Sequence, residues 1–123
     1  MDRFERGMQV RREVLGDAHV DRATAEATPI DSEFQRFITE VAWGTLWARD
    51  GLDRRTRTLV TVAILGALGR DEIDLHLRAA QRTGATLREV QEAILHVAVY
   101  AGLPAAHRAM ERAKKVFDAD AHE

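Results

Sequence analysis

Apolar residues along this 123-residue chain recur mostly at intervals of three and four, the spacing of helices that bury one face. No segment alternates between apolar and polar positions in the manner of a strand. Glycines and prolines separate the apolar segments, at Gly16, Pro29, Gly51, Gly69, Gly84, Gly102 and Pro104. The pattern predicts an all-α fold, a compact bundle of about six helices around one core.

The first helix is expected from Asp2 to Leu15, followed by a polar connecting segment and a second helix that starts near Asp31. The inner face of this second helix is expected to hold Phe34, Phe37, Ile38, Val41 and Thr45. Trp43 and Trp47 lie one turn apart in it. Large aromatic residues at this spacing pack in cores more often than they bind ligands, although a pocket role for Trp43 stays open.

The third helix, with Asp53 as a plausible N-cap, is apolar nearly all round over residues 59–65 and is expected to be the central element. Short turns join it to the next two helices, which should pack as its antiparallel neighbours. Thr86 and Glu89 form a capping box at the start of the fifth helix, and Pro104 opens the last one. Two further apolar faces are expected: Val90, Ala93, Ile94, Val97 and Ala101, then Ala106, Ala109, Met110, Ala113, Val116 and Phe117.

Composition narrows the class of protein. The length suits a single domain, residues 1–123, and a net charge of -2 gives no electrostatic footprint for nucleic acid. The chain has no cysteine, which excludes disulfides and thiol redox chemistry. No segment resembles a signal peptide or reaches the length of a membrane span, so a cytoplasmic protein without a membrane partner is expected.

His76 is the most informative titratable residue, because helical spacing places it on the same face as Ile73, Leu77 and Ala80. Histidine titrates near neutral pH, so a partly buried imidazole can donate or accept a proton. A hydrogen-bonded core histidine explains the same spacing, and the pattern alone does not separate the two interpretations.

Two more histidines fall on predicted helices. His96 shares a face with Glu92 and Tyr100, and His107 lies in the first turns of the last helix. Both are interpreted as ordinary surface residues, with a place beside His76 as the alternative. Their scattered positions make no metal-binding motif, so no metal is expected.

Arginines are dense before the most apolar helix, at Arg49, Arg54, Arg55 and Arg57. A solvated helix start explains most of them. A helix N-terminus already carries partial positive charge, so a cluster of arginines there is unfavourable unless acidic residues or a bound anion offset it. Arg57 is the best candidate to bind an anion, because it stacks below Thr61 and Ile64 at the edge of the apolar surface.

Five segments together resemble the γ-carboxymuconolactone (4-carboxymuconolactone) decarboxylases: VRREVLGDAHVDR (10–22), AWG (42–44), GLDRRTR (51–57), LHLRAA (75–80) and YAGLPAA (100–106). The third and fourth are also similar to the wider alkyl hydroperoxidase D-like superfamily. Redox members of that superfamily carry a Cys-x-x-Cys pair where this chain has Gly69 and Glu72, so peroxidase activity is not expected.

The resemblance implies a cofactor-free decarboxylase of a dicarboxylate lactone in the β-ketoadipate route, with an alkyl hydroperoxidase D-like fold and a homo-oligomeric assembly, a trimer or hexamer. It implies that His76 acts as hydrogen-bond donor or acid, that Glu72 orients or tunes it, and that Arg57 anchors the retained carboxylate. His19, expected in a loop, is added as a pocket residue, with Trp43, His96 and Tyr100 as further substrate contacts. The family pattern has glutamine at position 96 and asparagine at 107, so neither histidine inherits a catalytic role.

Two alternatives remain open. One is a non-redox relative that acts on another lactone or on a β-keto acid. The other is a helical oligomeric ligand-binding module without catalytic activity, in which the histidines are purely structural.

Overall fold

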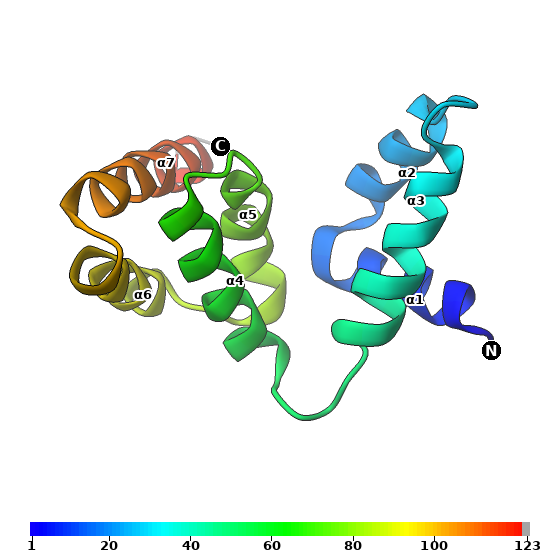
Figure 1. Ribbon diagram of the computed structural model, residues 1–123, viewed down its shortest axis with the longest axis horizontal. Helices are drawn as coiled ribbons and strands as arrows, with labels where there is room; N and C mark the ends of the chain where they lie inside the picture. The colour runs from blue at the N-terminus through cyan, green and yellow to red at the C-terminus, as the bar shows by residue number, and fades with distance from the viewer. Residues whose placement is uncertain (122–123) are drawn as a thin grey trace. The chain divides into compact units, whose positions relative to one another are not determined.

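The structure is a computed structural model that describes residues 1–121, and these form seven α-helices and one π-helix without a strand. The all-α prediction is therefore confirmed, with one α-helix more than expected. Contacts divide the chain into two compact units, an N-terminal unit from Met1 to Asp53 and a C-terminal unit from Arg54 onward (Figure 1). None of the helices described is long and apolar enough to cross a membrane.

The N-terminal unit begins with α1 (Arg3–Leu15) and α2 (Asp17–Glu26). The carboxylate of Asp2 caps α1 by accepting a 2.8 Å hydrogen bond from the amide of Glu5. The prediction of a polar connecting segment after Leu15 was wrong. Gly16 adopts a φ of 91°, which a side chain would disfavour, and this turn lets a second helix start at once.

A continuous helical segment follows, composed of α3 (Ser32–Ile38) and the π-helix η1 (Thr39–Leu46). The predicted inner face of this segment was wrong. Phe34 and Phe37 are each 60% exposed and Val41 is also exposed, whereas Thr39 and Trp43 are buried. Over Thr39–Leu46 the wider π-helical turn changes which positions share a face, so the α-helical period does not carry on to Val41. Phe34 and Phe37 lie in the α-helical part of the segment and are exposed because no other element of their unit covers them.

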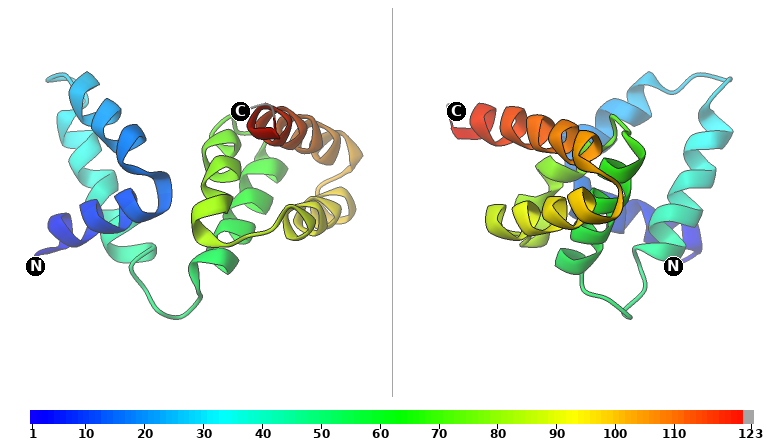
Figure 2. Two further views of the ribbon diagram at one scale, coloured as in Figure 1. Left: turned by 180° about the vertical axis from the view of Figure 1, so that it is seen from behind. Right: turned by 60° about the vertical axis from the view of Figure 1, so that its left-hand side comes forward.

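Two glycines allow α1 to cross η1 at very short range (Figure 2). A Cβ atom on Gly7 would lie 2.1 Å from the carbonyl oxygen of Thr39, and one on Gly44 would lie 2.4 Å from the carbonyl oxygen of Arg3. Backbone therefore packs on backbone at this crossing, which fixes the register of the two helices.

The C-terminal unit contains α4 (Arg54–Leu68), α5 (Ile73–Thr83), α6 (Leu87–Tyr100) and α7 (Leu103–Ala121). α4 contacts each of the other three helices, which confirms its predicted central position. The core of this unit comprises Val62, Ile73, Leu77, Ala80, Ala85, Val90, Ile94, Val97, Ala106, Ala109, Ala113 and Val116. Ala101 and Met110, which were expected to face inward, are exposed.

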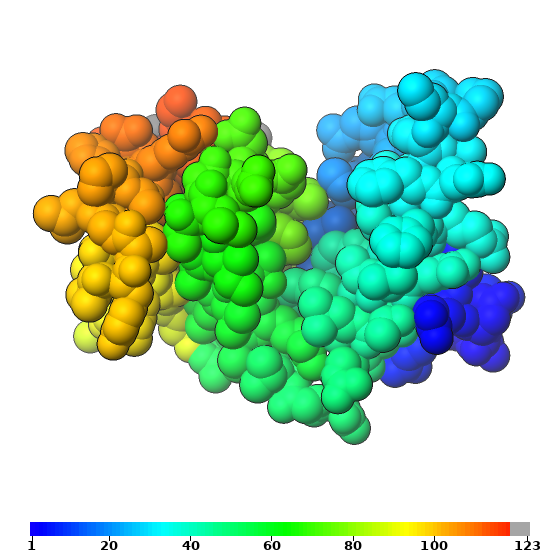
Figure 3. Space-filling model, in the orientation of Figure 1, coloured from blue at the N-terminus to red at the C-terminus, as the bar shows by residue number. Residues whose placement is uncertain are grey.

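One side of α4 is left uncovered by its own unit. Val60, Ile64 and Leu68 are four residues apart and are 45%, 52% and 61% exposed. Figure 3 shows the surface of α4, in green, facing the viewer along the length of the helix. The helix that the sequence shows to be apolar nearly all round is therefore covered by its own unit over only part of its circumference.

Candidate active site

His76 lies on α5 and is only 9% exposed. Ile73, Leu77 and Ala80 are buried as well, which confirms the predicted inward face. Burial lowers the pKa of His76 to about 4, because the imidazolium form loses its hydration. At neutral pH the ring is therefore uncharged and offers one N–H donor and one acceptor nitrogen.

Arg57, in the first turns of α4, is also 9% exposed. Its helical register relative to α5 is given by the Thr58 hydroxyl, which donates to the Thr83 hydroxyl at 2.8 Å. His76 precedes Thr83 by seven residues, which at 1.5 Å per residue is roughly 10 Å along the helix axis. The backbone positions of Arg57 and His76 thus lie at different levels of the α4–α5 pair.

Glu72 immediately precedes α5 and is exposed. Among residues 1–121, no side chain forms a hydrogen bond or ion pair with its carboxylate. The structure therefore does not show Glu72 orienting the imidazole of His76 through a direct contact.

His96 and Tyr100 form a stacked pair on α6, with ring centroids 6.2 Å apart and planes 11° apart. His96 lines a groove of about 610 Å³ between α4 and α6, whose lining residues are Leu59, Val60, Ala63, Ile64, Arg88, Glu89, Glu92, Ala93 and His96. His76 and Arg57 do not line this groove. The structure thus brings His96 and Tyr100 together but places them apart from the two buried groups.

His19 and Trp43 belong to the N-terminal unit. His19 is half-buried on α2, so the expectation that it lies in a loop was wrong, for the reason given at Gly16. Trp43 is buried and packs against Trp47, with ring centroids 5.1 Å apart and planes tilted by 31°. This is the core packing that their spacing favoured.

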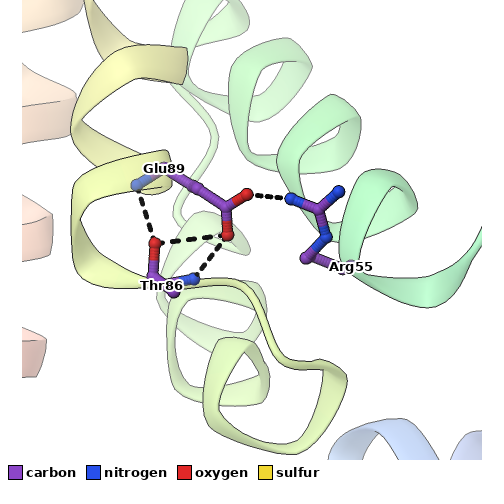
Figure 4. Close-up of polar contacts among 3 residues, drawn as sticks. All are labelled: Arg55, Thr86 and Glu89. Atoms are coloured by element: carbon purple, nitrogen blue, oxygen red, sulfur yellow. Dashed lines mark hydrogen bonds and ion pairs between the residues drawn. The ribbon is translucent and has the colours of Figure 1, made fainter.

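The arginine cluster at the start of α4 is offset in part by an acidic side chain. Arg55 forms an ion pair with Glu89, whose carboxylate also accepts a hydrogen bond from the amide of Thr86 at 3.0 Å (Figure 4). The predicted capping box is therefore confirmed, and its carboxylate also binds a neighbouring helix. The charge of Arg55 is therefore offset by an acidic residue and needs no bound anion.

The surface interpretation of His107 is also confirmed. Its ring is exposed and lies 3.2 Å from the carboxylate of Glu111, one turn along α7. In the part of the chain that the structure describes, no three His, Asp or Glu side chains cluster closely enough to hold a metal ion.

A buried polar cluster in the N-terminal unit was missed by the sequence analysis. Arg11 on α1 is only 6% exposed and donates to the side chains of Thr39 and Gln35. The sequence does hold a signal for it, because Arg11 is the charged residue on the face that Gly7, Val14 and Leu15 bury. A charged residue within an apolar stripe is uncommon enough to single out.

Comparison with known proteins adds independent information. A model of the carboxymuconolactone decarboxylase family matches residues 32–115, a range that includes Arg57, Glu72 and His76. Over 116 residues the chain is 50% identical to a 4-carboxymuconolactone decarboxylase of Acinetobacter baylyi, which covers 94% of this chain and 87% of that protein.

Two further relatives carry decarboxylase names. A nitrosuccinic acid decarboxylase of Metarhizium robertsii is 46% identical over 108 residues, 87% of this chain and 76% of that protein. A 4-carboxymuconolactone decarboxylase sequence of Pseudomonas putida is 55% identical over 42 residues, 34% of this chain and 88% of that sequence. The two relatives that cover most of this chain thus bear names with different substrates.

Proposed function

The chain belongs to the carboxymuconolactone decarboxylase family, and from that membership we propose that it is a carboxy-lyase that converts 4-carboxymuconolactone to β-ketoadipate enol-lactone and CO2 in the catabolism of aromatic compounds. The observation that carries this proposal is the 50% identity to the Acinetobacter baylyi enzyme over 94% of the chain. The aligned region includes both the helix that carries His76 and the start of α4.

The substrate itself explains why such a reaction needs no cofactor. As the carboxylate leaves the ring carbon as CO2, the electron pair of the broken C–C bond delocalises through the ring double bond into the lactone carbonyl. The resulting dienolate is then protonated at its α carbon. The lactone is the electron sink, so the protein has to supply hydrogen bonds, a proton and a binding site for the carboxylate that is retained.

We assign His76 to the lactone carbonyl as a hydrogen-bond donor. Its lowered pKa supports a neutral imidazole in the free enzyme, which donates through one N–H without carrying a charge. Negative charge develops on the carbonyl oxygen during the reaction, and a preorganised donor at such an oxygen contributes about 3 kcal/mol in comparable enzymes.

Arg57 is assigned to the retained carboxylate, because a guanidinium binds a carboxylate through two parallel hydrogen bonds. Burial of Arg57 supports the assignment, since a cation with little solvent around it interacts more strongly with an anion. Glu72 is exposed, so we assign it only an electrostatic influence on His76. Contacts of His19, Trp43, His96 and Tyr100 with the substrate stay predictions.

The fungal relative favours a second candidate, the decarboxylation of another dicarboxylate. Nitrosuccinic acid shares two features with 4-carboxymuconolactone: two carboxylates, and an electron-withdrawing group that stabilises the carbanion left by CO2. The same two protein groups, a hydrogen-bond donor and a carboxylate anchor, would serve both substrates.

We also propose that the protein assembles as a homo-oligomer, a trimer or hexamer, and acts in the cytoplasm. The uncovered apolar side of α4, with Val60, Ile64 and Leu68, supports assembly. Exposed Val99 and Leu103, at the end of α6 and the start of α7, add to the apolar surface of the same unit.

The test is to incubate the purified protein with 4-carboxymuconolactone, following the loss of its ultraviolet absorbance and the release of CO2. The proposal expects one CO2 for each lactone consumed, with His76→Ala as the inactive control. Turnover of nitrosuccinate but not of the lactone would select the second candidate. Absence of turnover with both would leave the non-enzymatic binding module.

A further inference from the structure

Arg11 is a buried cation whose partners are all neutral. Its two terminal nitrogens donate to the Thr39 hydroxyl and to the side-chain oxygen of Gln35, each at 3.2 Å. Its Nε is fully enclosed and has no hydrogen-bond partner among the described residues. Within residues 1–121, no carboxylate lies within ion-pair distance of this guanidinium.

This arrangement is costly in a protein interior. Removing a charged group from water is unfavourable unless an opposite charge compensates for it, and buried arginines are normally paired. Burial lowers the pKa of Arg11, which reflects the same loss of hydration. Neutral oxygens accept hydrogen bonds from two nitrogens of Arg11, but they leave its positive charge uncompensated. The hydrogen-bond network around the guanidinium is therefore incomplete.

The guanidinium lines a cavity of about 360 Å³ that lies wholly within the N-terminal unit. Most of the exposed wall surface is apolar, and the rest comes from hydroxyl, amide and charged groups. The lining residues are Phe4, Met8, Arg11, Thr24, Ala27, Ser32, Glu33, Gln35, Arg36 and Thr39. A pocket that is mainly apolar with a small number of polar groups is typical of a site for a small organic molecule.

The other charged groups of the cavity are compensated or solvated. Arg36 pairs with Glu40 at 3.0 Å, and its guanidinium lies 4.5 Å from the ring centre of Phe4. Glu33 is exposed, so water screens its carboxylate. Arg11 is therefore the charge in this cavity that a ligand would have to match.

Local backbone structure holds Arg11 in place. Gly7, one turn before Arg11, is the point where α1 meets the carbonyl of Thr39 at the shortest range. Thr39 is also the first residue of η1, and π-helical turns occur frequently at functional sites. The Thr39 hydroxyl donates to the backbone carbonyl of Gln35 at 2.8 Å, which fixes the orientation of the hydroxyl that accepts from Arg11.

We propose that this cavity binds a small organic carboxylate with an apolar body, and that Arg11 is the residue that receives the carboxylate. The carboxylate supplies the charge that Thr39 and Gln35 cannot, and the apolar body contacts Phe4 and Met8. This inference does not depend on decarboxylase activity, because its evidence lies entirely in the N-terminal unit.

Benzoate is a suitable probe, because it combines one carboxylate with an apolar ring, and benzamide is its uncharged counterpart. Binding to the full-length protein is measured by calorimetry, with the fluorescence of Trp43 and Trp47 as a second signal from the same unit. We expect benzoate to bind at least tenfold more tightly than benzamide. Equal affinities, or no binding of benzoate, would overturn the proposal without requiring any variant.

Arg11→Met tests the role of the cation, with Arg12→Met as the matched control. Arg12 is the next residue of α1 but pairs with Asp17 and Asp21 at the surface. We expect Arg11→Met to weaken benzoate binding at least tenfold and Arg12→Met to leave it unchanged. Arg11→Met is also expected to retain or raise the melting temperature of the ligand-free protein, since it removes an uncompensated buried charge. Two results together would show a structural role instead: a large fall in the melting temperature of Arg11→Met, and benzoate binding that is retained in both Arg11→Lys and Arg11→Gln.

The carboxylate could come from the decarboxylase substrate or from a separate ligand, and kinetics with 4-carboxymuconolactone separates the two sources. If the cavity receives the substrate, benzoate inhibits competitively and Arg11→Met raises KM at least tenfold. If it receives a separate ligand, Arg11→Met leaves KM within a factor of two while benzoate binding is lost. Both results support a carboxylate site, and a protein without turnover is still testable by calorimetry.

Discussion

Arg55 on α4 and Thr86 at the start of α6 share one carboxylate, that of Glu89. Glu89 closes the capping box of α6 and also pairs with Arg55 of the neighbouring helix. A local signal for the start of a helix is thus also a tertiary contact, and it ties together the first turns of the two helices that flank the α4–α6 groove.

Glu89→Ala removes both interactions, so we expect it to lower the free energy of unfolding by about 1–2 kcal/mol. Glu89→Gln retains a side-chain oxygen for the amide of Thr86 but loses the ion pair, and it should cost only about 0.5 kcal/mol. Urea unfolding at neutral pH measures the two values. Equal losses for the two variants would mean that the capping box contributes little.

His76 makes a specific contribution to the pH dependence of stability. Its pKa is lowered to about 4 in the folded protein, whereas an unfolded chain has the ordinary value of 6.5. Above pH 6.5 the ring is neutral in both the folded and the unfolded state, so the lowered pKa does not reduce stability there. Between 6.5 and 4 the unfolded state binds the proton more tightly, so stability falls as the pH falls, by up to about 3 kcal/mol.

Unfolding of the wild type and of His76→Gln across pH 7 to 4 checks this contribution. Glutamine has a similar size and no titration, so we expect the variant to lose less stability than the wild type over this range. Parallel curves would show that His76 titrates normally.

A neutral His76 also predicts that kcat for the lactone shows no inflection from this residue between pH 6 and 8.

Arg57→Lys retains the charge but loses the planar fork that binds a carboxylate through two hydrogen bonds. If Arg57 anchors the retained carboxylate, we expect KM to rise about tenfold with a smaller change in kcat. Steady-state kinetics with 4-carboxymuconolactone measures both. Unchanged KM and kcat would exclude the anchor role, and unfolding curves identify any loss that comes from misfolding.

Glu72→Gln tests whether the exposed carboxylate influences His76. Since solvent screens the charge and no hydrogen bond joins the two residues, we expect kcat to fall by less than about threefold. Asp71→Asn, which alters the preceding exposed carboxylate, is the matched control. A much larger fall in Glu72→Gln alone would show that Glu72 approaches His76 when substrate is bound.

Ile64→Glu introduces a charge in the middle of the uncovered face of α4. Burying this glutamate in a subunit interface would be costly, so we expect the variant to elute as a smaller species than the wild type in size-exclusion chromatography with light scattering. Gln91→Glu adds the same charge at an exposed polar position of α6 and should leave the assembly intact. Identical oligomeric masses for all three proteins would place the interface elsewhere, and a wild type with the mass of one chain would contradict the proposed assembly.

Local sequence determined most of the helices and their caps. Apolar periodicity, the capping box at Thr86 and the inward face of His76 are properties of neighbouring residues, and the structure reproduces them. Periodicity failed at Gly16, which starts a second helix without a connecting loop, and beyond Thr39, where the π-helix exposes Val41 and buries Trp43. It also failed at Phe34 and Phe37 of α3, whose apolar spacing does not correspond to a buried face.

Tertiary structure decided how deeply the polar residues are buried and which groups they contact. Sequence spacing placed Glu72 one turn from His76, yet only the fold shows that one is exposed and the other desolvated. Arg11 meets Thr39 and Gln35 because two glycines let distant helices cross backbone to backbone, a contact that no local pattern encodes. Burial and charge compensation depend on residues far apart in the chain, and for that reason the chemistry of these sites follows from packing rather than from spacing.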